Sequence, residues 1–164
     1  MTTKADFTPD EWKAIFSAAP MAGLAVTAAS PNGPFGVMKE VFAVGASIGE
    51  TLQKGSSNAL VNALIADIKS HGTKPERPQD IRTPEEAKTA ALENLKKVSA
   101  ILAAKAPGAE GDGFKRWIVG ISKNVAEASN EGGFLGFGGT KVSDAEKQAL
   151  QAIAQALGVP DTAV

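Results

Sequence analysis

Three helix-start signatures constrain the fold of this chain more than any other feature. In each, a hydroxyl residue is followed three positions later by glutamate, which is the arrangement of a capping box. The three pairs are Thr8 with Glu11, Thr83 with Glu86, and Ser143 with Glu146. The hydroxyl accepts a hydrogen bond from an exposed backbone N–H, and the carboxylate complements the helix dipole. Because no segment alternates with the period of a strand, the sequence predicts an all-α fold.

Apolar spacing and chain breaks divide the sequence into about seven helices. Apolar residues recur at helical intervals within each segment, and clusters of glycine, proline, serine and asparagine separate the segments. The expected helices cover residues 9–18, 20–29, 37–54, 59–70, 84–104, 114–130 and 144–157. A chain of 164 residues can bury a core without disulfides, so we expect one helical domain, a bundle spanning residues 1–164.

Residues 14–38 contain no charged side chain. A membrane-spanning helix needs about 20 continuous apolar residues, and Pro20, Pro31 and Gly33 interrupt this stretch. Two explanations remain: a helix buried within the chain's own core, or helices covered by a second copy of the chain. We therefore expect no membrane span, and we predict a homodimer.

Composition narrows the classes of function. The absence of cysteine excludes disulfides, zinc-thiolate sites and thiol catalysis. A net charge of −1 without a basic face gives nucleic-acid binding little electrostatic basis. The first residues lack the apolar segment of a signal peptide, so we expect a cytoplasmic protein.

A short phrase, V-x-x-A-S-x-x-G-x-F, occurs at residues 26–35 and again at residues 125–134. In both copies the pattern predicts the end of a helix, a glycine-containing loop, and a second helix with an early glutamate, Glu40 or Glu146. One interpretation is an internal pseudo-twofold repeat of a helix-loop-helix unit. The alternative is chance similarity in a chain rich in alanine, serine and glycine.

The two glutamates suggest a metal site. If the repeated units face each other, Glu40 and Glu146, together with Asp144, can offer the oxygen ligands that Ca²⁺, Mg²⁺ or Mn²⁺ prefer. The alternative is that both glutamates complement helix dipoles, with Glu146 also completing its capping box.

The segment from the glycine-rich loop through residues 142–154 resembles the repeated motif of tellurite-resistance TerB-like proteins. That motif is a glycine-rich turn, a small apolar residue, Ser or Thr, two further residues and Glu, which opens a helix; here it is Val142, Ser143 and Glu146. The earlier segment around Glu40 is similar to a diverged copy. The resemblance implies an all-helical fold with internal pseudo-symmetry, a role in stress response, and divalent-metal binding at Glu146, Glu40 and Asp144. The turn lacks the aspartate that the motif often carries.

The favoured function is therefore a non-enzymatic interaction or sensing module with an unknown protein partner. One alternative is a helical protein that binds an apolar ligand among the uncharged helices. Another is an enzyme that uses His71, the single histidine, with a carboxylate such as Asp67 or Glu50. The loop at residues 132–139 lacks the lysine and hydroxyl order of a phosphate-binding loop, so its apolar residues are expected in the core or in a patch for a partner.

Overall fold

The computed structural model describes residues 2–30, 33–71, 81–130 and 142–160, with the side chains at 33–42, 71 and 129–130 outside that description. Within it the chain is helical, and the described residues contain no strand, which confirms the predicted all-α class. A short 3₁₀ helix, η1 (Lys4–Asp6), precedes six α-helices. These are α1 (Pro9–Ala29), α2 (Gly33–Lys54), α3 (Ala59–His71), α4 (Pro84–Lys105), α5 (Ala109–Asn130) and α6 (Asp144–Leu157).

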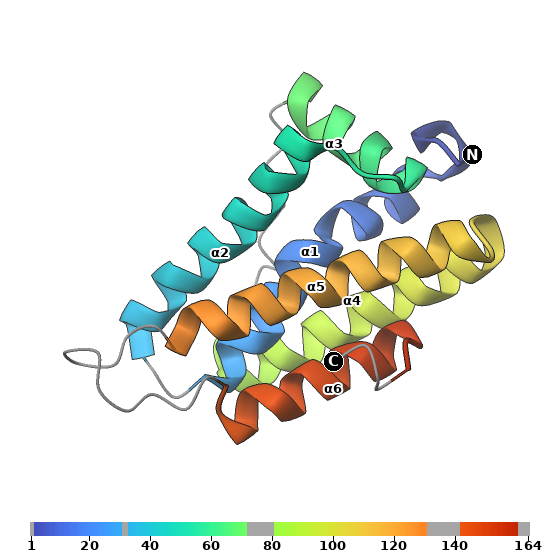
Figure 1. Cartoon of the computed structure of the whole chain (residues 1–164). Helices are drawn as coiled ribbons and strands as arrows, with labels where there is room; N and C mark the ends of the chain where they lie inside the picture. Colours follow the sequence, from blue (N-terminus) through green and yellow to red (C-terminus); the bar gives the residue numbers. More distant parts are fainter. Residues whose placement is uncertain (1, 31–32, 72–80, 131–141, 161–164) are drawn as a thin grey trace.

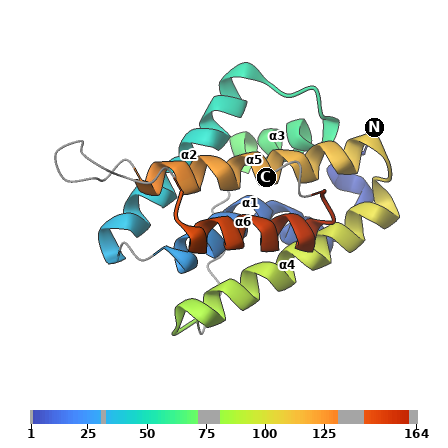
Figure 2. The same ribbon diagram turned by 60° about the horizontal axis from the view of Figure 1, so that its bottom comes forward.

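Helix α1 lies at the centre of the molecule. It packs most extensively against α4 and α5, and it also contacts α2 and α6. Figure 2 shows α4 and α6 on one side of this arrangement and α2 and α3 on the other. Helix α2 runs along α5 and extends outward from the bundle (Figure 1). The core is therefore built by α1, α4, α5 and α6, and α2 and α3 cover one side.

The central position of α1 explains much of the uncharged stretch. Nine of its residues are buried, most of them small: Trp12, Ala14, Ile15, Ala18, Ala19, Ala22, Gly23, Ala25 and Val26. A helix surrounded by other helices has no face on which charged side chains reach water. For α1, burial inside the chain's own core is thus sufficient, and a second copy is not needed to cover it.

Residues 9–29 form one helix, where the sequence predicted two. Pro20 lies inside α1 and does not end it. Proline removes one backbone N–H and crowds the preceding turn. Here the buried residues on both sides, Ala18, Ala19 and Ala22, hold the two halves in line against the core. The prediction of a break at this point was wrong, and the described part of the chain has six α-helices instead of seven.

The start of α5 also differs from the prediction. Residues 106–113 were expected to form a loop, but the helix begins at Ala109, directly after Gly108, whose φ is +76°. Two glycines inside the first turns are needed for packing. A Cβ on Gly111 would collide with the carbonyl oxygen of Ala106, and one on Gly113 would lie 2.5 Å from Nδ2 of Asn58. Glycine at positions 111 and 113 lets Ala106 and Asn58 lie close to the backbone at the start of α5.

The remaining helix bounds follow the predictions closely. Helix α6 has the predicted limits, α3 and α4 are each one residue longer, and α2 begins four residues earlier than expected. No helix in the described ranges combines the length and the apolarity that crossing a bilayer requires.

Candidate functional site

Glu146 is buried completely and completes the capping box at the start of α6. Its Oε2 accepts hydrogen bonds from the backbone N and from Oγ of Ser143, both at 2.8 Å. Ser143 Oγ in turn accepts from the backbone N of Glu146 at 3.2 Å. The capping interpretation of Glu146 is therefore confirmed, and the metal interpretation stays a prediction.

The other two predicted ligands lie in different surroundings. Asp144 has a side chain that is 91% exposed, and its Oδ1 accepts a hydrogen bond from Lys147 Nζ at 3.0 Å. Glu40 lies two turns into α2, whose first turn carries no acidic residue, and the position of its side chain is outside the described residues. Among the side chains that are described, no three acidic, histidine or cysteine groups gather closely enough to hold a metal ion.

The repeated phrase is described only in part. Its first halves end two helices, since α1 stops at Ala29 and α5 at Asn130. Residues 31–32 and 131–141, which include the glycine-rich segment 132–139, lie outside the description. Gly33, which was expected in the first loop, is instead the first residue of α2. The pseudo-twofold repeat therefore remains a prediction.

Each carboxylate considered as a partner for His71 already has other partners. Glu50 Oε1 accepts from Lys54 Nζ at 2.6 Å on the surface of α2, and this contact lowers the pKa of Glu50 and raises the pKa of Lys54. Asp67 accepts hydrogen bonds from two residues of the N-terminal region. His71 is the last residue of α3, and its side chain lies outside the described part.

Asp67 is the centre of a polar cluster whose carboxylate is buried and which no sequence pattern predicted. Its Oδ1 accepts from Lys4 Nζ and its Oδ2 from Trp12 Nε1, both at 2.8 Å. The Asp67 side chain is only 8% exposed, whereas that of Lys4 is 53% exposed. We call these three residues the Asp67 cluster. It joins η1, α1 and α3, which are far apart in the sequence.

One feature of the sequence could have indicated this cluster. Leu60, Leu64 and Ile68 form the apolar face of α3, and Asp67 lies one helical turn after Leu64 on the same face. An aspartate placed among buried leucines needs a partner, and so does the indole N–H of a buried tryptophan. The spacing in the sequence does not predict that the indole N–H of Trp12 pairs with the carboxylate of Asp67.

The first residues form a strap across one end of the bundle. We define it as residues 2–7; Figure 1 places it beside α3 and the start of α5. Thr2 donates to Glu110 through its backbone N at 2.8 Å and through its hydroxyl at 2.9 Å. Phe7 is 7% exposed and packs against Trp12, with ring centroids 5.8 Å apart. Both polar and apolar contacts thus fix the strap.

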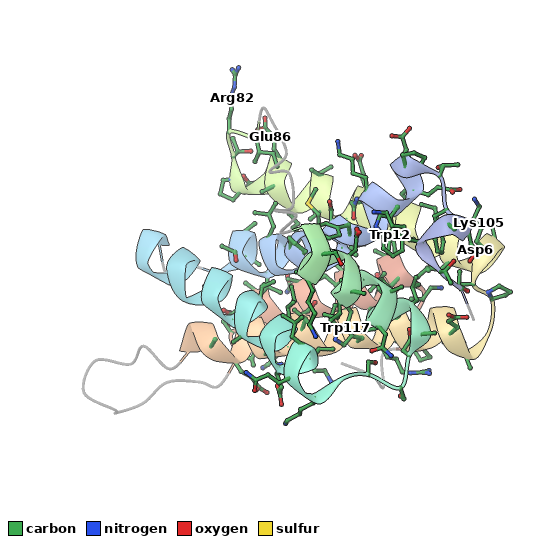
Figure 3. The ribbon with its side chains drawn as sticks, turned by 90° about the horizontal axis from the view of Figure 1, so that it is seen from above. Asp6, Trp12, Arg82, Glu86, Lys105 and Trp117 are labelled. Carbon is green, nitrogen blue, oxygen red and sulfur yellow. The ribbon has the colours of Figure 1, made fainter. Side chains whose placement is uncertain are left out.

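Lys105, at the end of α4, holds the other side of the strap. Its Nζ donates to the carbonyl oxygen of Asp6 at 3.1 Å, and Figure 3 shows these two residues side by side. It also donates to Oε2 of Glu11 at 2.6 Å. The Lys105 hydrogen bond and the backbone N–H of Thr8 lower the pKa of Glu11. The backbone N–H and hydroxyl of Thr3 lower the pKa of Asp6 in the same way.

Helix α2 is held on α5 partly by polar contacts. Trp117 Nε1 donates to Thr51 Oγ1, and Asn124 Nδ2 donates to Ser47 Oγ, both at 3.1 Å. On another side of α2, Gly45 and Ala46 are exposed. A Cβ built at Gly45 or Gly49 meets no described atom within 4 Å. No other helix of the described chain therefore packs on this part of α2.

Comparisons of the chain with protein-family models, with curated proteins and with solved structures found no match. The resemblance to TerB-like proteins therefore rests on the short motif around Ser143 and Glu146 and on its diverged copy around Glu40.

Proposed function

We propose that this protein is a non-enzymatic helical interaction module, of the stress-response kind that the TerB-like motif implies, and that it self-associates through α2. The observation that carries the proposal is the uncovered side of this helix. Gly45 and Ala46 are exposed there, and no described atom lies near the Cβ positions of Gly45 and Gly49.

The chemistry of this face favours a second copy of the same helix. It presents small residues without charge, so two α2 helices can approach closely without burying an unpaired charged group. Towards the end of α2, the next charged residues are Glu50 and Lys54, which pair with each other on the surface. Glu50 and Lys54 therefore keep their partner when the face is covered; the side chains of Lys39 and Glu40, before Gly45, lie outside the description.

A divalent metal forms the second part of the proposal. Glu146, Asp144 and Glu40 are the ligands that the motif implies, and hard cations prefer such carboxylate oxygens. The capping role of Glu146 means that any metal bound there would compete with its hydrogen bonds from Ser143. A weak site fits this competition better than a tight one.

Sedimentation velocity over a range of concentrations tests the self-association. We expect the wild-type protein to shift from monomer to dimer as concentration rises. Ala46→Glu should move this transition to higher concentration by at least about tenfold, because it buries an unpaired carboxylate in the contact. Ala100→Glu is the matched control, since Ala100 is an exposed alanine within α4.

Two outcomes would overturn the proposal. The first is a monomer for the wild-type protein at the highest concentration measured. The second is an equal effect of the Ala46 and Ala100 substitutions, which would show that charge anywhere on the surface, and not the α2 face, controls association.

A further inference from the structure

We propose that α3 and the N-terminal strap (residues 2–7) dock and undock as one unit, and that the Asp67 carboxylate is the joint between them. This unit is a conformational device built into the fold: docked, it covers the end of α1 that carries Trp12. The inference is independent of the self-association proposed for α2.

Helix α3 is the least integrated of the six described α-helices. Its main contacts are with α5, with α2 and with η1 of the strap, whereas α1 packs extensively on α4 and α5, and α6 packs on α4, α1 and α5. Its apolar side chains Leu60, Val61 and Leu64 are nonetheless fully buried or nearly so. If α3 leaves, it uncovers apolar surface, while the four-helix core keeps its mutual contacts. Elements with few contacts to the rest of a fold open locally, below the free energy of global unfolding.

The strap is the second part of the proposed unit. Thr2, Asp6 and Phe7 anchor the strap to α5, α4 and α1. Its side-chain contact with α3 is the Lys4–Asp67 ion pair. Lys4 Nζ also lies 5.9 Å from the centre of the Trp12 ring. The contact between the strap and α3 depends on both partners, because α3 presents the buried carboxylate and Lys4 of the strap helps to neutralise it.

Asp67 links α3 to the strap through Oδ1, which accepts a hydrogen bond from Lys4, and links α3 to α1 through Oδ2, which accepts one from Trp12. A buried carboxylate is stable only when it is paired, so loss of either donor weakens the other contact. In Asp67→Asn the amide has one oxygen and one NH₂ group. The NH₂ group would face a second donor, and one of the two contacts must break.

Hydrogen exchange measured by mass spectrometry on the full chain tests this coupling. In Asp67→Asn we expect exchange to rise by about 10- to 100-fold in residues 2–7 and in residues 59–71 together. Exchange in α4 and α6 should stay unchanged. Glu93→Gln is the matched control, since it makes the same carboxylate-to-amide change on the exposed face of α4.

A second variant keeps the test decisive if Asp67→Asn fails to fold. Lys4→Met removes the ion pair from the strap side, where the side chain is half exposed and little core packing is lost. It should accelerate exchange in α3 as well as in the strap. Faster exchange in only one of the two elements would overturn the proposal. An equal rise in all six helices, or no change in either element, would also overturn it.

Discussion

Replacing Glu146 with alanine should destabilise the protein by about 2 kcal/mol. The substitution removes the acceptor of two hydrogen bonds from Ser143. Losing half of a capping box costs about 1 kcal/mol. The Glu146 side chain is 0% exposed, so truncation also leaves a cavity that costs about 1–2 kcal/mol. Relief from burying a carboxylate offsets part of that sum.

Thermal unfolding followed by circular dichroism measures this effect. For a chain of this size, about 2 kcal/mol corresponds to a fall in Tm of about 4–8 °C. Glu146→Gln should cost clearly less, because one amide oxygen can accept both hydrogen bonds and the volume is kept. Gln148→Ala, on the exposed side of the same helix, should stay within about 0.5 kcal/mol of the wild type. A Tm for Glu146→Ala equal to that of Gln148→Ala would refute the assignment of Glu146 as a buried cap.

The same variants separate the cap from a metal ligand. If the proposed site exists, Ca²⁺, Mg²⁺ or Mn²⁺ should raise the Tm of the wild-type protein. The gain should disappear in Glu146→Gln, which preserves the cap and removes the charge that a divalent cation needs. A metal-dependent gain that is equal in both proteins would exclude Glu146 as a ligand, and no gain in the wild type would remove the metal site from the account.

Three further predictions concern residues of α1. Gly23→Ala should destabilise the protein by about 1 kcal/mol despite the better helix propensity of alanine, because its Cβ would lie 2.5 Å from Cγ2 of Val44. In a Val44→Ala background the same change should stabilise the protein. Urea unfolding of the four proteins measures both effects, and a destabilisation in both backgrounds would contradict this explanation. Pro20→Ala should restore a backbone N–H inside α1 and raise the free energy of unfolding by about 1–2 kcal/mol, which urea unfolding would show as a higher midpoint. A lower midpoint would contradict this. The pKa of Glu11 is lowered in the folded state, so its contact with Lys105 stabilises the protein fully above the unfolded-state pKa and is lost as pH falls through the folded-state pKa. Glu11→Gln should therefore make Tm decline less steeply below about pH 4.5. An unchanged decline would argue against the Glu11–Lys105 contact as a source of the pH dependence.

Local signals in the sequence were sufficient for most of the helices. The capping boxes at Thr8, Thr83 and Ser143 each form both of their hydrogen bonds, and each opens a helix at the predicted residue. These signals work because the interacting groups are three residues apart, so no tertiary contact is needed to bring them together.

The errors at Pro20 and at the start of α5 have one physical cause. Pro20 and the glycines at 111 and 113 normally disfavour a helix, and they were interpreted in that way. Tertiary packing overrides this local preference: α1 continues because buried alanines hold it, and α5 tolerates its glycines because Ala106 and Asn58 leave no room for a side chain. A single sequence does not reveal which neighbour will lie there.

In the candidate site, too, local spacing predicted some contacts, and only the folded chain shows the others. The cap formed by Glu146 was predictable from its spacing to Ser143, although its complete burial was not. The Asp67 cluster joins residues 55 and 63 positions apart, and only the folded chain brings them together. Lys105, which holds Asp6 and Glu11 across the chain, is a similar case.

Pulsed dipolar spectroscopy on a single spin label tests the central claim, self-association through α2, most directly. The chain has no cysteine, so Gln53→Cys provides one unique labelling site in α2, at an exposed position two helical turns after Ala46, and leaves the small residues of the proposed contact unchanged. Helices that pack on each other lie about 8–10 Å apart. We therefore predict a short, well-defined distance between the labels of two copies, and a longer or undefined one for Ala100→Cys. Absence of dipolar coupling at Gln53 at high protein concentration would contradict the account.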